Sequence, residues 1–429
     1  MRSYIKTYLF LLFLLPCGVT DSQELPYARE IVNTLASPAF KGRGYVQNGN
    51  KKSANYIIQQ YKKSGLKAFQ NDYRQPFGVS VNTFPGRMMV SIGNKQLVAG
   101  KDYLVDPASP SARGSFGLFV ISGKELTDSV KLKKAIDAGK GKFLVIDDRG
   151  SGSYTHENAA RVSEALLYLK TGKNLNLAGI IIHTAGKLTW SISGVRIPHP
   201  VIVVGPAVEI SENSILSLDI ESELGQYTTA NVVGYLPGTA VPDSFLVITA
   251  HYDHLGKMGK DTYFPGANDN ASGVAMMLAL ARYFSSHPAR YTVVFMAFTG
   301  EEAGLLGSLY YVNHPFFDLR KIRFLVNFDL AGTGDDGIKV VNGTVFPGQF
   351  KLLRDINDGK NLLKSVQVRG PACNSDHCPF YSRGVPCFYI YTLGGIDAYH
   401  DIYDKAETLP LTEFNDYFNL MAEFFTKVR

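Results

Sequence analysis

Short apolar runs alternate with longer amphipathic stretches along the second half of the chain. The apolar runs predict strands at 230–235, 245–250, 292–298, 324–328 and 387–391. Apolar residues at helical spacing predict helices at 272–285, 305–313, 349–357 and 411–427. Strands that are apolar throughout are buried on both faces. The pattern therefore predicts an α/β fold with a mixed, mostly parallel sheet sandwiched by helices.

The first half of the chain has a different pattern. Helices are expected at 27–36 and 50–64, where apolar residues again recur at helical spacing. Short β-rich runs broken by glycine and proline then follow, with two helical stretches between them, which indicates a smaller α+β domain inserted into the larger one. We expect the domains to divide as 23–76 for the first part of the larger domain, 77–225 for the insert and 226–429 for the rest of the larger domain.

The first 22 residues have the features of a secretory signal peptide. Arg2 and Lys6 precede an apolar run at 8–15 that a proline ends. This run is too short to span a bilayer. Cys17 is a candidate for lipid attachment, but the proline directly before it fits a lipidation site poorly. We expect an exported protein, periplasmic or extracellular, with no stable membrane span once the signal is removed.

The composition is that of a globular protein and argues against nucleic-acid binding. The chain has 429 residues, of which 45% are hydrophobic and 19% charged, and its formal net charge is +6. The basic residues are scattered, without the stripe of Lys and Arg interleaved with aromatics that marks a nucleic-acid surface. Beyond the signal the cysteines are Cys373, Cys378 and Cys387, an odd number that allows one disulfide but leaves the pairing open.

Two adjacent glutamates, Glu301 and Glu302, follow the predicted strand at 292–298. Carboxylates side by side at the end of a buried strand repel each other and lose hydration. A metal ion bound by one of them would compensate for this. The alternative is a solvated acidic pair at a helix start, where the helix dipole favours negative charge. Taken alone, the pair fits the solvated acidic turn better. The other candidate ligands in the sequence reverse that preference in favour of a metal site.

Other candidate ligands also lie beside the ends of predicted elements. His251 and Asp329 each follow a predicted strand directly, Asp269 lies in a polar turn before a long helix, and His400 lies in a loop before the last helix. In α/β sheets ligands bind at the carboxyl ends of the strands. Two histidines and several carboxylates suit zinc. Two zinc ions bridged by one carboxylate would use all of these ligands and leave one glutamate as general base on the bridging water.

The motifs that carry these residues are His251-Tyr252-Asp253, 266–273, Gly300-Glu301-Glu302, Asn327-Phe328-Asp329, Ser375-Asp376-His377 and Tyr399-His400. Together they resemble the motifs of the M28 family of zinc metallopeptidases. The resemblance covers the mature chain broadly and is highly specific over 230–405. The segment 77–225 resembles, less specifically, a protease-associated (PA) domain inserted into such peptidases.

The resemblance implies a set of metal ligands. His251 and Asp329 would bind one zinc ion, and Glu302 and His400 would bind the other. Asp269 would bridge the two ions. The implied activity is that of an aminopeptidase, which removes N-terminal residues from peptides by means of a zinc-activated water.

The resemblance also implies catalytic residues. Glu301 would be the general base, and Asp253 would orient His251 and fix its tautomer. Tyr399 matches a position that in some relatives donates to the developing oxyanion. The peptide bond between Asp269 and Asn270 is expected to be cis, as in relatives.

Several neighbouring residues have simpler interpretations. Alternation along the strand directs His254 away from the ligands. We expect His377 to make a structural contact in its loop, and Trp190, in the insert, to pack rather than to bind substrate. Asp404, four residues beyond His400, is expected to support a ligand or to form a turn.

Two other functions fit parts of the sequence. A glutaminyl cyclase-like aminoacyltransferase shares the fold but uses one zinc ion, and it tends to place tryptophan where this chain has Tyr399. A non-catalytic binding module on the same fold would usually have lost ligands, and here all of them are present. The sequence leaves open the preferred N-terminal residue, a carboxypeptidase or dipeptidase action, the role of the insert and the oligomeric state.

Overall fold

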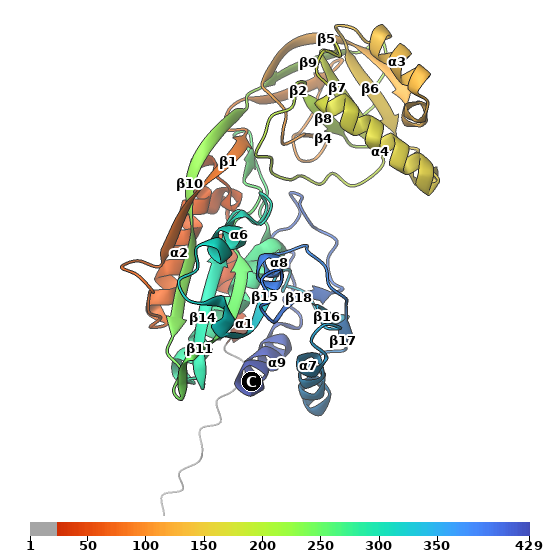
Figure 1. Cartoon of the computed structure of the whole chain (residues 1–429). Coiled ribbons are helices and arrows are strands. Elements are labelled where there is room, and N and C mark those ends of the chain that lie inside the picture. Colours follow the sequence, from red (N-terminus) through yellow and green to blue (C-terminus); the bar gives the residue numbers. More distant parts are fainter. Residues whose placement is uncertain (1–23) are drawn as a thin grey trace, which may run out of the picture.

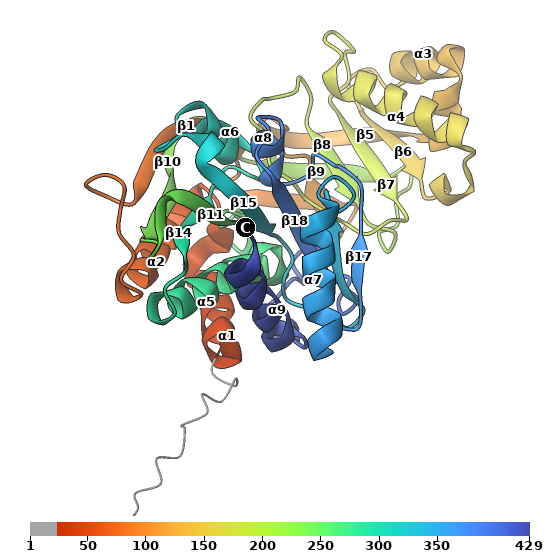
Figure 2. The ribbon, with the colours of Figure 1, turned by 60° about the horizontal axis from the view of Figure 1, so that its bottom comes forward.

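The computed structural model describes residues 24–429, so the expected signal peptide at 1–22 lies outside the described residues. Two eight-stranded sheets divide this part of the chain, one in a larger domain and one in a smaller domain (Figures 1 and 2). The helices described include none with the length and apolar character needed to cross a membrane.

The sheet of the larger domain is mixed. In spatial order its strands are β1 (Arg74–Thr83), β10 (Glu223–Leu236), β14 (Tyr291–Phe298), β11 (Val241–His251), β15 (Ile322–Phe328), β18 (Cys387–Leu393), β16 (Gly337–Val341) and β17 (Val366–Val368). The central run from β14 through β11 and β15 to β18 is parallel. Every residue of β14 is buried, as its continuous apolar run predicts.

Helices cover both faces of this sheet, which confirms the predicted α/β sandwich. One face is packed by α1 (Glu24–Leu35), α2 (Gly49–Lys63), α5 (Gly273–Ser286), α7 (Pro347–Lys360) and α9 (Phe414–Lys427). The other face is packed by α6 (Leu306–Asn313) and α8 (His377–Tyr381). A short hairpin of β12 (Lys257–Met258) and β13 (Thr262–Tyr263) lies beside the sheet. Most predicted elements agree with these bounds to within a few residues.

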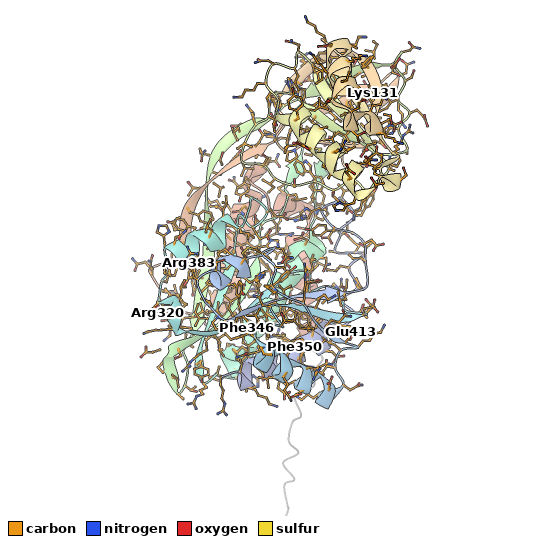
Figure 3. All side chains as sticks on the ribbon, turned by 45° about the vertical axis from the view of Figure 1, so that its right-hand side comes forward. Lys131, Arg320, Phe346, Phe350, Arg383 and Glu413 are labelled. Atoms are coloured by element: carbon orange, nitrogen blue, oxygen red, sulfur yellow. A yellow bond between two sulfur atoms is a disulfide. The ribbon has the colours of Figure 1, made fainter. Side chains whose placement is uncertain are left out.

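The smaller domain is a second α+β unit. In spatial order its strands are β3 (Lys95–Gln96), β2 (Met88–Ile92), β9 (Ile215–Ile220), β5 (Ala112–Ser122), β6 (Phe143–Asp148), β7 (Gly179–Thr184), β8 (Val201–Val204) and β4 (Tyr103–Val105). Its helices are α3 (Ser129–Ala138) and α4 (His156–Thr171). Lys131 of α3 and Phe346 beside α7 lie toward opposite ends of the molecule (Figure 3).

A long antiparallel ribbon joins the two domains. Strands β1 and β10 pair along their whole shared length, from Arg74 opposite Val232 to Thr83 opposite Glu223. The expected domain borders at 77 and 225 therefore fall inside these two strands. The ribbon runs from the larger sheet toward the smaller domain (Figure 1).

Candidate metal centre

Parallel pairing brings the candidate ligands to one edge of the large sheet. In β11, His251 is the last residue and lies opposite Phe298, the last residue of β14. Glu301 and Glu302 follow Phe298 after a two-residue turn, and Asp329 directly follows β15. The strand order thus explains why residues far apart in sequence meet here.

Two further ligand candidates come from irregular segments. Asp269 lies in a buried turn ahead of α5, and the Asp269–Asn270 peptide bond is cis, as expected. His400 lies in the loop between β18 and α9. A cavity of about 310 Å³ opens over the group and is lined in part by His251, Asp269, Glu301, Asp329, Tyr399 and His400.

Asp269 lies between the two histidines and offers one carboxylate oxygen to each. Its Oδ1 is 3.3 Å from Nε2 of His251, and its Oδ2 is 3.0 Å from Nε2 of His400. Asp329 Oδ1 lies 3.3 Å from the same nitrogen of His251, and Glu302 Oε2 lies 3.2 Å from that of His400. The five side chains therefore form two clusters that share Asp269.

These spacings fit the ligands of a metal ion. Around a tetrahedral ion with bonds of about 2.0–2.1 Å, neighbouring ligand atoms lie roughly 3.3 Å apart. The chain also provides two close groups of possible ligand atoms, His251 with Glu301 and Asp329, and His251 with Asp269 and Glu302. One oxygen of Asp269 is buried with no hydrogen-bond partner, as expected for an atom meant to bind an ion.

Backbone carbonyl groups fix the tautomer of both histidines. Nδ1 of His251 lies 3.2 Å from the carbonyl oxygen of Asp253, and Nδ1 of His400 lies 2.9 Å from that of Trp190. A carbonyl oxygen can only accept, so each Nδ1 carries the proton and donates it. Each Nε2 then faces the carboxylates and is the ring nitrogen left to bind a metal.

The side chain of Asp253 lies beside the His251 ring without a hydrogen bond to it. Its Oδ1 is 3.8 Å from Nδ1 of His251, and the same oxygen accepts a hydrogen bond from the backbone N–H of Glu301 at 3.3 Å. Burial raises the pKa of Asp253 to about 7. This carboxyl group thus links the turn that carries Glu301 to the strand end that carries His251.

The ionisable groups in this cluster strongly affect one another. Burial opposes the charged form of His400, but Glu302 and Asp269 outweigh it and raise the His400 pKa to about 11. Burial alone would also lower the pKa of His251, yet Asp329, Glu301 and Asp269 hold it well above its usual value. Without a metal, each ring therefore carries a second proton, on Nε2, that a metal ion would have to displace.

Tyr399 and Glu301 line the cavity but belong to neither of the two clusters that share Asp269. The Tyr399 ring stacks on the His400 ring with centroids 4.0 Å apart, and its side chain is half exposed. Burial and the surrounding carboxylates raise the pKa of Glu301 well above its usual range. Both groups are thus available to a molecule that enters the cavity.

The expectation that His254 points away from the ligands is wrong. Its Nδ1 lies 2.7 Å from Oε1 of Glu302, and its ring is buried. The alternation argument fails because β11 ends at His251, so the strand pattern does not continue to His254. His254 holds the oxygen of Glu302 that does not face His400.

Two residues of this region support the turn that carries Asp269. The carboxylate of Asp404 accepts hydrogen bonds from the backbone N–H groups of Asn268 and Asp269, at 2.8 and 3.0 Å, in agreement with its expected supporting role. No pattern in the sequence points to the second residue, Arg43. It is fully buried and donates to carbonyl oxygens of Tyr252, Leu35, Pro265, Gly266 and Asp269.

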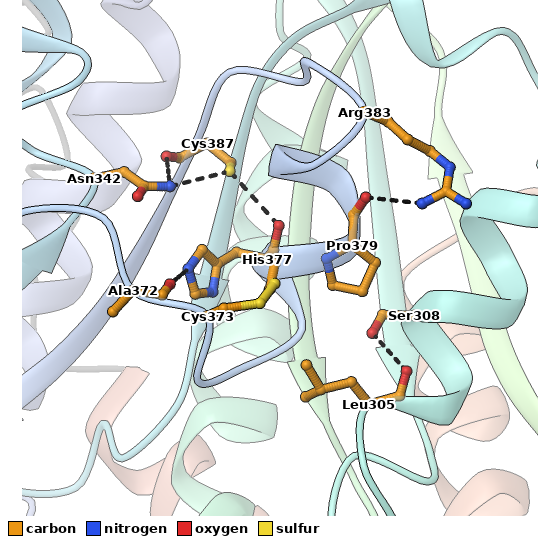
Figure 4. The surroundings of a disulfide bond; sticks show 10 residues. Leu305, Ser308, Asn342, Ala372, Cys373, His377, Pro379, Arg383 and Cys387 are labelled. Carbon is orange, nitrogen blue, oxygen red and sulfur yellow. Dashed lines mark hydrogen bonds between the residues drawn. A yellow bond between two sulfur atoms is a disulfide. The ribbon is translucent and has the colours of Figure 1, made fainter.

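A disulfide joins Cys373 and Cys378 in the loop before and at the start of α8, and Cys387 is a buried free thiol (Figure 4). The ring of His377 lies in the same loop, with Nε2 2.8 Å from the carbonyl oxygen of Ala372. The expected structural contact of His377 is thus present.

Residues 231–425 match the model of peptidase family M28. This segment, residues 231–425, belongs to peptidase family M28. It is 29% identical to an aminopeptidase of Bacillus subtilis, YwaD, over 393 residues, which are 85% of this chain and 76% of that protein. A probable zinc metalloprotease of Pyrenophora tritici-repentis is 35% identical over 116 residues, 26% of this chain and 24% of its own length.

A likeness of fold to a solved structure extends over both domains. A structure of a peptidase M28 precursor from Shewanella amazonensis superposes with a TM-score of 0.68, and the match covers 93% of this chain and 92% of that one. The identity of 17% makes this a likeness of fold alone. The matched segment is that of a peptidase, and it contains the cavity, which lies where the strands of the large sheet end.

Proposed function

We propose that this M28 peptidase is an exported di-zinc aminopeptidase that removes N-terminal residues from peptides. The observation that carries the proposal is the position of Asp269, whose two carboxylate oxygens each face a different histidine. One carboxylate divided in this way is suited to bridging two ions. Imidazole nitrogens and carboxylate oxygens are the donors that zinc prefers in such sites.

The ligand assignment follows the contacts of the two histidines. His251 and Asp329 would hold the first ion, and Glu302 and His400 would hold the second, with Asp269 shared. A zinc pair at this position would activate water and polarise the peptide carbonyl group. The relative from Pyrenophora tritici-repentis is named a probable zinc metalloprotease, which supports the choice of zinc.

Glu301 would be the general base. It lines the cavity, and its raised pKa favours the acceptance of a proton in the metal-free protein. Asp253 would hold His251 in the tautomer described above. The half-exposed Tyr399 hydroxyl would donate a hydrogen bond to the oxygen that becomes negatively charged in the transition state.

The choice of N-terminal cleavage rests on the Bacillus subtilis relative, which is an aminopeptidase by name and aligns over most of this chain. A glutaminyl cyclase-like transferase is less well supported. The single tryptophan, Trp190, is a buried residue of the insert and does not line the cavity, and Tyr399 stands beside the last histidine. A non-catalytic binding module is also less well supported, because it would not need a buried cluster of metal ligands with Glu301 beside it as a base.

Export is the second part of the proposal. It rests on the sequence of the first 22 residues, and the Cys373–Cys378 disulfide agrees with an oxidising compartment. Fractionation of producing cells, followed by N-terminal sequencing, tests it. We expect protein outside the cytoplasm that begins near residue 21 or 23. Uncleaved protein in the cytoplasm would contradict this part alone.

The enzymatic part is tested by measuring zinc content and hydrolysis of aminoacyl p-nitroanilides on the same sample. We expect about two zinc ions per chain and release of p-nitroaniline from substrates with a free amino group. N-blocked substrates are the matched control and should remain intact. One zinc ion together with cyclisation of N-terminal glutamine would replace the proposal with the transferase.

A further inference from the structure

A segment of the inserted domain reaches into the larger domain and contacts the loop that carries His400. We call residues 187–190, in the connection between β7 and β8, the strap. The loop that it meets runs from the end of β18 to the start of α9 and contains no regular helix or strand. His400 itself has a positive φ of 52°. This ligand candidate therefore depends on contacts from outside its own segment.

Two hydrogen bonds join Trp190 of the strap to His400. The backbone N–H of Trp190 donates to the carbonyl oxygen of His400 at 2.8 Å. The Nδ1 of the His400 ring donates in turn to the carbonyl oxygen of Trp190 at 2.9 Å. One residue of the insert thus holds both the backbone and the ring of His400, and the second bond aims Nε2 at Asp269 and Glu302.

The side chain of Trp190 anchors the strap between the two domains. Its ring stacks on Phe264 of the larger domain, with centroids 4.7 Å apart and planes at 23°. The ring also packs on Phe84, and its Nε1 donates to the carbonyl oxygen of Val105 at 2.7 Å. Only 6% of the residue is exposed. The backbone of Trp190 is therefore held firmly where His400 meets it.

Lys187 forms a second connection to the same loop. Its ammonium group lies 2.6 Å from Oδ2 of Asp401 and also donates to the carbonyl oxygen of Asp397. The other oxygen of Asp401 accepts hydrogen bonds from the backbone N–H groups of Tyr403 and Asp404. Asp404 in turn supports the Asp269 turn, so the strap is linked to two of the three ligands around the second ion, His400 and Asp269.

We propose that the strap is a positioning element of the metal centre, with Trp190 and Lys187 as positioning residues for His400. The inserted domain thereby controls occupancy of the second metal site, while His251 and Asp329 hold the first ion without its help. This inference rests on the proposed di-zinc function. Groups that orient a metal ligand commonly change metal affinity by about 10- to 100-fold when they are lost.

The test measures the zinc affinity of each site by titrating metal-free protein, in the full chain, against a competing chelator. We expect Trp190→Ala to weaken the second site by about 10- to 100-fold and to leave the first site within about twofold. Lys187→Met should weaken the second site by a smaller factor. His400→Ala provides the reference for a second site that has lost its ligand.

Lys170→Met is the matched control for Lys187→Met. Lys170 also lies in the insert and forms an ion pair of 2.8 Å, with Asp106, but it does not touch the His400 loop. We expect this variant to bind both ions as the wild type does. Trp190→Phe keeps the backbone and an aromatic ring, and it should restore most of the affinity that Trp190→Ala loses.

The outcomes separate this inference from the function on which it rests. A wild-type chain that binds fewer than two zinc ions overturns the proposed function. A wild-type chain with two ions, together with unchanged affinities in Trp190→Ala and Lys187→Met, overturns the role of the strap alone. If Trp190→Ala does not fold, the comparison of Lys187→Met with Lys170→Met decides. Equal affinities in that pair overturn the inference.

Discussion

Glu301 and Glu302 are neighbours in the chain, yet their carboxyl groups titrate in opposite directions. Burial raises the pKa of Glu301 well above its usual range. Burial acts on Glu302 in the same sense, but His400 and His254 outweigh it and lower the Glu302 pKa to about 2. One glutamate therefore behaves as a permanent anion between two histidines, and its neighbour is suited to exchange a proton with a molecule in the cavity.

Replacing Glu301 by Gln should remove activity without removing metal. Glutamine keeps the shape of the side chain but cannot accept the proton, and a general base typically contributes about 10²- to 10⁴-fold to a rate. We expect kcat to fall by at least about 100-fold while zinc content stays at the wild-type value. Steady-state kinetics and metal analysis on one preparation check this. Wild-type kcat in the variant would refute the general-base assignment.

Replacing Asp269 by Asn should affect both metal sites at once. The neutral amide is a poor bridging ligand, and its two ends can no longer offer an anionic oxygen to His251 and His400. We expect zinc content to fall below one ion per chain. Asp335→Asn, which changes an exposed carboxylate, is the control and should keep wild-type zinc content. Loss of one ion with full retention of the other would argue against a shared ligand.

Zinc binding should release protons at neutral pH. In the metal-free chain the pKa of His400 is raised to about 11 and that of His251 lies well above its usual value, so both rings are protonated at pH 7. Zinc binds only the neutral ring. Affinity should therefore rise between about pH 6 and 8, by about tenfold per pH unit for each proton released.

Calorimetry in buffers of different ionisation enthalpy measures the number of protons released. We expect between one and two protons for the two histidines. A titration in which the heat does not depend on the buffer would show that neither ring holds a proton before metal enters.

Replacing Arg43 by Lys should destabilise the protein although the charge is kept. The guanidinium group donates to five carbonyl oxygens, whereas an ammonium group has three donors and would leave at least two carbonyls unpaired. Each unpaired buried carbonyl costs about 1–3 kcal/mol, so the free energy of unfolding should fall by at least about 2 kcal/mol.

Denaturant unfolding of the metal-free chain checks this prediction. The control is Arg320→Lys, which changes a 90% exposed guanidinium group paired with Asp318. It should change the free energy of unfolding by less than about 0.5 kcal/mol. Equal midpoints for the two variants would mean that the Arg43 contacts contribute little to stability.

Cys387 should resist thiol reagents in the folded protein. Burial raises the pKa of this thiol to about 12, so the reactive thiolate is scarce at neutral pH, and the sulfur is buried. In a chain without the N-terminal segment that contains Cys17, we expect one thiol to react with Ellman's reagent in denaturant and almost none before unfolding. Fast reaction in the native state would show that the region around β18 opens readily.

The sequence alone predicts the larger fold and the meeting of the candidate ligands at one edge of its sheet, for a physical reason. Strands buried on both faces must be apolar throughout, so β11, β14 and β15 stand out as continuous runs. Polar residues that directly follow such runs, such as His251 and Asp329, must lie at one edge of the sheet. The prediction needed only the positions where the strands end.

The supporting residues could not be predicted in this way. Arg43 contacts the Asp269 turn through backbone carbonyls, and any sequence can supply a carbonyl oxygen. Trp190 and His400 are 210 positions apart, and their two hydrogen bonds also use backbone groups. His254 was misplaced because alternation holds only inside a strand. Contacts of this kind depend on how distant segments pack together, and the local pattern of apolar and polar residues does not predict that packing.

The most direct test of the central claim is a crystal structure of the zinc-loaded protein with data collected at the zinc absorption edge. We expect two anomalous peaks about 3.5–4 Å apart. Asp269 should lie between them, His251 and Asp329 on one side, and Glu302 and His400 on the other. A single peak, or two peaks that do not share Asp269, would contradict it.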